Sequence, residues 1–328
     1  MNEFSLIEKY FAPLAEGFPG ALDLKDDAAL VTVSADSQLV LTKDAITAGV
    51  HFLADDPPEA IARKLVRVNV SDLAAMRARP YAIMLAAVFP DTIREEWIAG
   101  FARGLSEDCR EFGIYLIGGD TTATSGPLTL SLTAVGLVGQ GKEMRRSGAQ
   151  AGDFVCVSGT LGDAALGLNI ALGKLDGLPG EARDFLLDRY RIPQPRIDLS
   201  LGLGDCVTAG MDLSDGLPGD VRHLCEASGL GVEIDIDALP LSSFAQDVVN
   251  AYPDFWSVVA DGGDDYELLL TISPVKMKKA ETIAARLGLR LTKIGVMTDA
   301  PDITFHRGSG EDVSLLLSGY QHFKGKNS

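Results

Sequence analysis

The chain has 328 residues, with 46 acidic and 29 basic side chains, so its formal net charge at pH 7 is −17. This charge disfavours nonspecific binding to nucleic acids and to anionic membranes, which are themselves polyanions. A composition of 46% hydrophobic and 23% charged residues excludes a wholly disordered chain. At about 100–200 residues per domain, the length predicts two domains.

No apolar run approaches the roughly 20 residues that a bilayer-spanning helix needs, and the longest, 81–89, has the size of a strand. The first residues include Glu3 and Glu8 and lack a basic segment followed by a long apolar one, so we expect no signal peptide. The cysteines form no CxxC pair, which indicates reduced core thiols at Cys109, Cys156, Cys206 and Cys225. We therefore expect a cytoplasmic protein.

The N-terminal part alternates extended and helical patterns. Hydrophobic periodicity predicts strands at 28–33, 38–42, 81–89, 114–118 and 128–139, and helices at 58–76 and 92–112. The following segment, 145–153, is polar, contains glycine and has no apolar period, so we place the domain boundary there. The predicted domains are 1–145 and 146–328.

The second part also mixes both patterns. It predicts helices near 163–173, 181–190 and 217–228, and strands near 153–159, 231–236, 266–272, 289–296 and 312–317. The expected fold class is α/β (α+β), with two mixed α/β domains whose strand order the sequence does not define.

Aspartate outnumbers glutamate twofold, 31 to 15, which indicates turns, caps and ion ligands more than solvated helix surfaces. We expect acidic side chains at the ends of apolar segments, where α/β proteins assemble their sites. These are Asp26, Asp27, Asp44, Asp72, Asp120, Asp212, Asp215, Asp264 and Asp265. Each alone is better explained as a cap or a turn, but together they indicate a site for Mg²⁺, which prefers oxygen ligands.

Several standard motifs are absent. Residues 136–142 read GLVGQGK, but Glu143 stands where a P-loop needs Ser or Thr, and there is no GxGxxG, HExxH or GxSxG. Four scattered histidines make a zinc site improbable. Arg145 and Arg146 either grip a phosphate or are solvated charges on a linker, and His51 is either functional or a satisfied buried histidine.

Nine motifs occur in order along nearly the whole chain: KDDAAL, LTKDAITAGVHF, VNVSDLAAM, LIGGDTT, RRSGAQAGD, SGTLGDAALGL, MDLSDGL, GGDDYELLLT and GYQHF. In this set the chain resembles the thiamine-monophosphate kinase family, of the superfamily of aminoimidazole ribonucleotide synthetase and selenophosphate synthetase. The resemblance implies two α/β domains with ATP and several Mg²⁺ ions in the cleft between them, and a homodimer formed through N-terminal strands. It implies transfer of the γ-phosphate of ATP to thiamine monophosphate, giving thiamine diphosphate and ADP.

The resemblance also implies roles for residues at matching positions. Metal ligands would be Asp27, Thr42, Lys43, Asp44, Asp72, Asp120, Asp212 and Asp215. ATP contacts would be Gly119, Asp120, Arg146 and Ser214, and contacts to thiamine monophosphate would be His51, Asp264 and Leu317. Three positions depart from the family pattern, because Lys43 replaces a common Thr, Asp264 a usual Glu and Leu317 a frequent aromatic residue.

Such a reaction needs no general base, because a phosphate monoester with a second pKa of about 6 is mostly deprotonated at pH 7. Like charges must instead be brought together, so the carboxylates are expected to hold Mg²⁺ around the phosphates. Two alternatives remain: a superfamily member that acts on a ribonucleotide amide or on selenide, and a noncatalytic, acidic module that binds divalent ions or ATP. A selenophosphate synthetase would be expected to have a reactive Cys near its N-terminus, but the first is Cys109.

Overall fold

The computed structural model describes residues 3–313 and forms two compact units. Unit 1 comprises Met1–Leu73 and Arg77–Glu143, and unit 2 comprises Ala74–Met76 together with the chain from Met144 onward. The division after Glu143 falls two residues before the expected boundary. No pattern in the sequence indicated that Ala74–Met76 belongs with the second unit.

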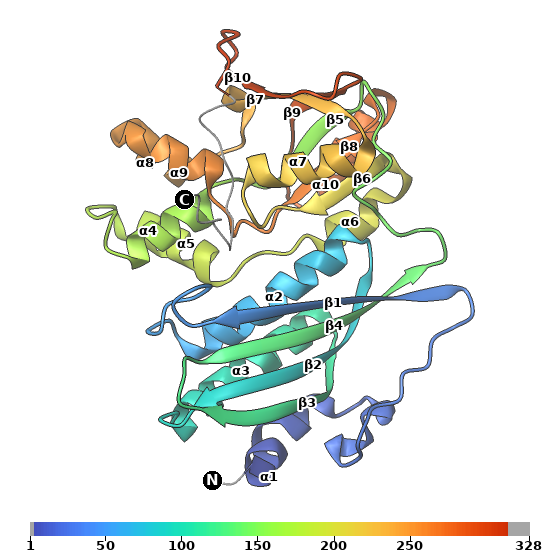
Figure 1. Ribbon diagram of the computed structural model, residues 1–328, viewed down its shortest axis with the longest axis vertical. Helices are drawn as coiled ribbons and strands as arrows, with labels where there is room; N and C mark the ends of the chain where they lie inside the picture. Colours follow the sequence, from blue (N-terminus) through green and yellow to red (C-terminus); the bar gives the residue numbers. More distant parts are fainter. Residues whose placement is uncertain (1–2, 314–328) are drawn as a thin grey trace, which may run out of the picture. The chain divides into compact units, whose positions relative to one another are not determined.

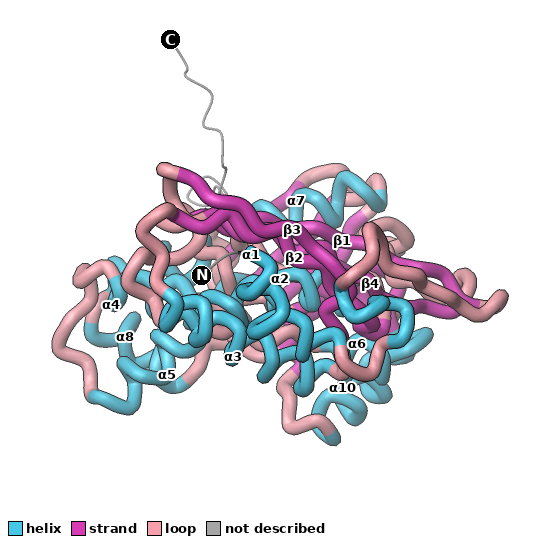
Figure 2. Tube along the Cα trace, turned by 90° about the horizontal axis from the view of Figure 1, so that it is seen from below, coloured by secondary structure: helices cyan, strands magenta, loops and turns pink. Residues whose placement is uncertain are grey.

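Unit 1 is a four-stranded sheet with two long helices on one face (Figures 1 and 2). The strand order is β1-β4-β2-β3, in which β2 and β3 are parallel and the other pairs antiparallel. The elements are α1 (Glu3–Leu6), β1 (Ser37–Thr47), α2 (Pro58–Ala75), β2 (Arg79–Pro90), α3 (Glu95–Phe112), β3 (Tyr115–Thr124) and β4 (Thr129–Gly139).

The core of unit 1 follows from the two periodicities of the sequence. In β4 the buried residues Leu130 and Leu132 alternate with partly exposed ones, as a strand with one covered face requires. Leu65 of α2 and Phe101 of α3 are fully buried. Helix α3 ends at Gly113, which adopts the left-handed conformation (φ 64°) and donates its N–H to the carbonyl of Cys109.

The strand expected at 28–33 is absent, and this prediction was wrong. The segment has irregular backbone, and Leu30 donates its N–H to the carbonyl of Gly20 rather than to a neighbouring strand. Its apolar residues Ala29 and Val31 pack instead against a cluster that includes Phe18. A short apolar run signals burial, but a strand also needs a pairing partner.

Unit 2 contains a six-stranded sheet of order β10-β7-β9-β5-β8-β6, antiparallel except for the β10–β7 pair. Its strands are β5 (Phe154–Ser158), β6 (Val207–Asp212), β7 (Gly231–Asp235), β8 (Leu268–Ile272), β9 (Leu291–Thr298) and β10 (Ile303–His306). Its helices are α4 (Asp163–Ala171), α5 (Gly180–Arg191), α6 (Ile197–Leu203), α7 (Leu217–Ser228), α8 (Ser243–Ala251), α9 (Trp256–Asp261) and α10 (Met277–Arg286).

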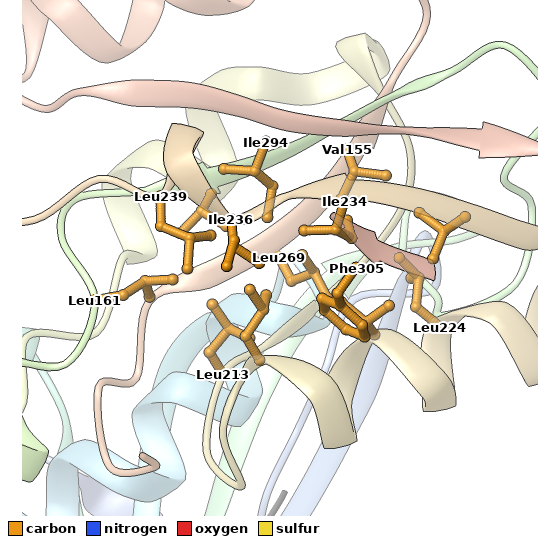
Figure 3. Packing of buried hydrophobic residues seen from close by; sticks show 14 of the residues in the cluster. Val155, Leu161, Leu213, Leu224, Ile234, Ile236, Leu239, Leu269, Ile294 and Phe305 are labelled. Carbon is orange, nitrogen blue, oxygen red and sulfur yellow. The ribbon is translucent and has the colours of Figure 1, made fainter. Parts of the chain in front are cut away.

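Strand β5 shows how both faces of this sheet are covered. Val155 and Val157 belong to the cluster that includes Leu224 of α7, which Figure 3 shows around Ile234 and Leu269. Cys156 points the other way, because its Sγ lies 3.7 Å from the sulfur of Met277 in α10. A strand buried on both faces reads as a continuous apolar run, as FVCVS does.

Several elements of unit 2 had no clear sequence signal. The short β6 contains Thr208 and Gly210, and α6, α8, α9, α10 and β10 were not predicted either. Of the strand expected at 312–317, Asp312 forms an isolated bridge to His306, and residues from 314 lie outside the described part. Between residues 3 and 313, no helix is long and apolar enough to cross a membrane.

Candidate active site

Three predicted site residues meet between β1 and α2 of unit 1. The hydroxyl of Thr42 donates a hydrogen bond to Oδ2 of Asp72, and the backbone N–H of Asp44 donates to Oδ1 of Asn69 at 3.2 Å. Thr42 and Asp44 share one face of β1, because alternate strand residues point the same way. Asn69 and Asp72 share one face of α2, because residues three apart in a helix are neighbours. The sheet and the helix therefore present their oxygen atoms to each other.

The carboxylates in this group repel one another. Partial burial, followed by the nearby negative charge of Asp72, raises the pKa of Asp44 to about 6. Two carboxylates in one half-buried place are stable together only when a proton or a cation reduces their repulsion. Mg²⁺ suits such a pair, since it commonly binds one or two carboxylates and completes its shell with waters and substrate phosphates.

Lys43 lies between these residues in sequence but on the opposite face of β1. It is exposed and is paired in register with Thr133 of β4. The strand alternation that directs Thr42 and Asp44 toward α2 directs the Lys43 side chain away from it. The backbone carbonyl of Lys43, rather than its ammonium, is the group that can serve as a ligand near Asp44.

A second group lines a pocket of about 190 Å³ at β3. The pocket contains three predicted residues, Asp27, Gly119 and Asp120, beside an apolar wall that includes Phe11 and Met84. A Cβ on Gly119 would lie 1.9 Å from the carbonyl oxygen of Leu85, so only glycine allows β3 to approach β2 so closely here. Gly119, next to Asp120, is thus needed first of all for the close packing of β3 against β2.

These two groups lie on opposite edges of the same sheet. Asp44 pairs in register with Leu132, Leu132 with Leu85, and Leu85 with Gly119. This row crosses three strand spacings of about 4.8 Å each, or roughly 14 Å in all. One copy of the sheet therefore does not bring Asp44 and Asp120 to a common ion.

In unit 2, β6 delivers Asp212 to a tight turn that leads into α7. The N–H groups of Ser214 and Asp215 donate to Oδ2 of Asp220 at 3.1 and 3.2 Å, so the turn closes on the first helical turn. Burial, with the charges of Asp212 and Asp215, raises the pKa of Asp220 to about 7. This is a second concentration of carboxylates.

The segment that carries Asp264 binds the same turn. Asp264 donates its N–H to the carbonyl of Ser214 at 2.9 Å, and Tyr266 donates to the carbonyl of Leu213 at 2.8 Å. Asp264 has φ 70°, in the left-handed region that Asp tolerates better than most residues. The predicted ATP contact Ser214 and the predicted substrate contact Asp264 are therefore neighbours.

The remaining predicted residues lie in ordered surroundings. Nδ1 of the half-buried His51 accepts a hydrogen bond from the N–H of Thr47 at 3.1 Å, which fixes the ring at the end of β1. Arg146 has an exposed side chain, but its carbonyl accepts a hydrogen bond from Ser228 at 3.0 Å, so its segment is attached to α7. Leu317 lies outside the described residues.

The expectation that the acidic residues stand at strand ends was wrong for two of them. Asp44 lies inside β1 and Asp120 inside β3, whereas Asp72 lies inside α2, within the helix predicted at 58–76. The strands are longer than expected because backbone pairing continues through polar and glycine residues that have no apolar pattern. Asp212 does end its strand, as expected.

Two residues of these groups were not predicted. Asn69 stands three residues before Asp72, and this spacing within a predicted helix was the available signal. Asp220 follows Asp215 by five residues and lies in the first turn of a predicted helix, where acidic residues are common caps. Among residues 3–313, no three His, Cys, Asp or Glu side chains lie together as a ready metal site.

Comparison with known proteins defines the class to which this fold belongs. A family model described as AIR synthase related protein, N-terminal domain, matches residues 25–138, and the corresponding C-terminal domain matches residues 150–308. The chain thus contains both domains of the AIR synthase-related proteins.

More similar relatives identify the family within this class to which the chain belongs. The chain is 41% identical over 324 residues to thiamine-monophosphate kinase of Caulobacter vibrioides, with 98% of this chain and 91% of the relative covered. It matches the crystal structure of thiamine-monophosphate kinase from Stenotrophomonas maltophilia with a TM-score of 0.85 and 38% identity, over 95% and 98% of the two chains. A structure of AaThiL complexed with AMPPCP and TMP matches with a TM-score of 0.79 and 30% identity, over 98% and 97%. The chain belongs to the thiamine-monophosphate kinase family.

Proposed function

We propose that this protein transfers the γ-phosphate of ATP to thiamine monophosphate, giving thiamine diphosphate and ADP. The observation that carries the proposal is the group formed by Thr42, Asp44 and Asp72, in which two mutually repelling carboxylates and a hydroxyl face one another. Acidic side chains repel a polyphosphate unless cations lie between them. The group is therefore suited to a nucleotide that arrives with Mg²⁺.

Asp44 and Asp72 would hold Mg²⁺ in unit 1, and Asp212 and Asp215 would do so in unit 2. When bound, the ion neutralises charge that develops on the transferred phosphoryl group. Thr42, Asp27 and Asp120 would complete the set of oxygen ligands, with the backbone carbonyl of Lys43 beside them. An ion held by one or two carboxylates would take the rest of its shell from waters and from the phosphates themselves.

The acceptor phosphate already carries negative charge at neutral pH, so no side chain has to remove a proton from it. What the chain contributes is position and charge. Gly119, Asp120, Arg146 and Ser214 are assigned to ATP, and Arg146 supplies the planar donor group that matches phosphate oxygens. His51 and Asp264 are assigned to thiamine monophosphate, whose cationic, aminopyrimidine-bearing body a carboxylate can engage.

A homodimer would bring Asp44 of one copy near Asp120 of the other, which a single sheet keeps apart. The two acids lie on β1 and β3, the two edge strands of this sheet, and an edge strand can pair with another chain. Pairing β1 of one copy with β3 of a second copy would bring Asp44 of one chain toward Asp120 of the other. We propose this arrangement, in a cytoplasmic enzyme that binds neither nucleic acid nor membrane.

The function is tested by incubating the purified protein with ATP and thiamine monophosphate, with and without Mg²⁺, and measuring ADP release and thiamine diphosphate formation. Free thiamine serves as a second acceptor. We expect thiamine diphosphate only with the monophosphate and only with Mg²⁺. ADP release without any phosphorylated thiamine product would overturn the proposal.

A further inference from the structure

Three chain segments meet in unit 2 around the residue next to Asp264. They are the segment that leads into the first residues of α4 (158–164), the turn that begins at the last residue of β6 (212–216) and the segment before β8 (262–267), here called the acceptor segment. Three backbone hydrogen bonds join the acceptor segment to the turn: Asp264 and Tyr266 donate to the turn, and Leu213 donates to the carbonyl of Glu267. Asp265, between Asp264 and Tyr266, points away from the turn toward α4 and makes different contacts.

The carboxylate of Asp265 binds the N-terminus of α4. Its Oδ2 accepts from the N–H of Gly162 at 2.7 Å, and its Oδ1 accepts more weakly from the N–H of Ala164 at 3.4 Å. Gly162 is the cap of this helix and has no side chain with which to bind these N–H groups. The distant Asp265 therefore supplies the hydrogen-bond acceptor that the local sequence lacks for the N–H groups at the start of this helix.

The backbone on both sides of Asp265 is held in an uncommon conformation. Asp264 and Tyr266 both have positive φ, 70° and 50°, a region that non-glycine residues enter only when their surroundings hold them there. An anchored side chain between them supplies such a restraint. Release of Asp265 would remove this restraint from both residues, Asp264 included.

Close packing adds a second restraint on the same segment. A Cβ on Gly263 would lie 2.3 Å from the carbonyl oxygen of Ser214, and one on Gly262 would lie 2.4 Å from the Cβ of Ala165 in α4. The two glycines thus bring the acceptor segment against the turn on one side and against α4 on the other. The glycines allow the acceptor segment to lie this close, and the hydrogen bonds of Asp265 hold it there.

The charged groups around Asp265 have partners of their own. Asp163, at the start of α4, accepts hydrogen bonds from Thr160 at 2.6 Å and from Ser242 at 2.5 Å. Glu267 forms a buried ion pair with Arg196. These contacts hold the flanking segments, whereas the contact of Asp265 with Gly162 joins the acceptor segment to α4.

We propose that Asp265 is a positioning residue that aims Asp264 at the acceptor by anchoring the acceptor segment to the N-terminus of α4. The inference rests on the proposed function, in which Asp264 contacts thiamine monophosphate. The turn that carries Ser214 has a further restraint of its own, because Asp220 accepts the N–H groups of Ser214 and Asp215. Loss of Asp265 should therefore affect the acceptor more than ATP.

The test measures kcat and both KM values for Asp265→Ala, Asp265→Asn, Asp264→Ala and the double variant Asp264→Ala/Asp265→Ala. We expect Asp265→Ala to raise the KM for thiamine monophosphate about tenfold, because a small misplacement of a binding group is costly. The KM for ATP should change less than threefold. Asp265→Asn keeps an oxygen that can accept from Gly162, and should recover most of the loss.

The double variant separates positioning from general damage. If Asp265 acts through Asp264, its removal should add less than about twofold to the KM of Asp264→Ala, because residues that act as a unit are not additive. The inference is wrong if the double variant raises the KM for thiamine monophosphate by the product of the two single effects. It is also wrong if Asp265→Ala raises the KM for ATP as much as the KM for thiamine monophosphate. Because KM does not depend on how much of the sample is folded, a loss of stability in Asp265→Ala leaves this comparison valid.

Asp235→Ala is the matched control, because Asp235 also caps a turn of unit 2 by accepting one backbone N–H, that of Asp237 at 3.0 Å. It should leave both KM values unchanged. The outcome also separates this inference from the proposed function. If the wild type does not phosphorylate thiamine monophosphate, the function is wrong. If it does and Asp265→Ala retains the wild-type KM, only the positioning role is wrong.

Discussion

At the scale of single residues, the acidic groups lower the stability of the folded chain and provide charges that suit a binding site. Asp44 and Asp72 face each other, and burial together with the nearby negative charge of Asp72 raises the pKa of Asp44 to about 6. Such an arrangement costs folding free energy and is typical of sites that bind charge. Removing one charge should therefore improve folding and impair function, which is the opposite of what a structural ion pair would do.

We expect Asp44→Asn and Asp72→Asn each to lower kcat at least about 100-fold at saturating Mg²⁺, as removal of preorganised electrostatic groups commonly does. Their thermal unfolding midpoints should equal or exceed that of the wild type. Coupled ADP-release assays and thermal denaturation measure the two quantities. The exposed Asp91→Asn is the control, and wild-type turnover in either site variant would contradict the assignment.

The raised pKa values also predict how stability depends on pH. Asp44 and Asp220, with pKa values of about 6 and 7, keep their protons where an unfolded Asp, at 3.8, has lost them. The folded chain then binds more protons than the unfolded chain, so these groups lower stability as pH rises from about 4 to about 7.

With EDTA present, the unfolding midpoint should therefore fall between pH 5 and pH 7.5, and Asp44→Asn should reduce this slope. Added Mg²⁺ should raise the midpoint more at pH 7.5 than at pH 5, because metal ligands must be deprotonated. Thermal scans at several pH values measure both effects. If the unfolding midpoint instead rises from pH 5 to pH 7.5 in both the wild type and Asp44→Asn, other titrating groups determine the pH dependence of stability.

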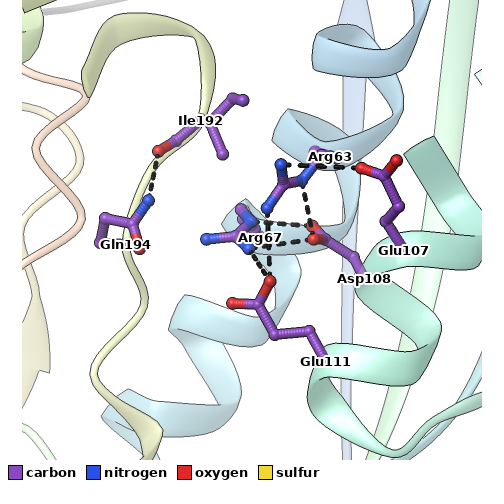
Figure 4. Close-up of polar contacts among 7 residues, drawn as sticks. All are labelled: Arg63, Arg67, Glu107, Asp108, Glu111, Ile192 and Gln194. Carbon is purple, nitrogen blue, oxygen red and sulfur yellow. Dashed lines mark hydrogen bonds and ion pairs between the residues drawn. The ribbon is translucent and has the colours of Figure 1, made fainter. Parts of the chain in front are cut away.

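At the scale of elements, a buried ion network joins α2 to α3 (Figure 4). Arg67 is 1% exposed and binds Asp108 at 2.8 Å and Glu111 at 2.5 Å, while Arg63 binds Asp108 at 2.9 Å. Burial raises the pKa of Asp108, and the two arginines oppose that shift. The helix that carries Asn69 and Asp72 is thus held to its neighbour by charges as well as by apolar packing.

We expect Arg67→Met to destabilise the protein by about 3–5 kcal/mol, because removal of one partner leaves a buried charge poorly compensated. Arg103→Ala, which removes the exposed pair with Glu59, should change stability little. Urea unfolding of both variants measures the difference. Equal effects would show that the buried network contributes no more than a surface pair.

At the scale of the whole molecule, unit 1 presents one sheet face with exposed apolar residues. Leu41 is 65% exposed, and Leu39 and Met84 are 42% and 40% exposed. Leu39 and Leu41 point away from α2, on the strand face opposite Thr42. Exposed apolar groups beside open strand edges are typical of surfaces that another chain covers.

We expect the protein in solution to have twice the mass of one 34.8 kDa chain. Leu41→Lys should shift it toward the monomer and lower kcat at least about tenfold, because an edge rich in Lys resists strand pairing. Light scattering after gel filtration, with assays on the same fractions, measures both. Val275→Lys, at an 88% exposed position of unit 2, is the control, and a fully active monomer would exclude a site shared between copies.

Local patterns in the sequence determined many of the helices and strands of this protein, its fold class and its family. The amphipathic periods of α2 and α3, the buried runs of β2, β4 and β5 and the family motifs can all be read without coordinates, because each depends on neighbours within a few residues. The fold class and the membership of the family follow from them. Periodicity failed at 28–33, where only alternate residues are partly buried and no neighbouring strand pairs with the segment.

Only the tertiary structure decided which acidic residues meet. Asp44 and Asp72 are 28 positions apart in the sequence yet share one site, whereas Asp44 and Asp120 lie on opposite edges of one sheet, because strand order is set by pairing between distant segments. The same holds for Asp265, whose partner Gly162 lies about a hundred residues earlier in the chain. A carboxylate in a sequence shows that a charge is present, but its use depends on the backbone N–H groups and charges that folding places around it.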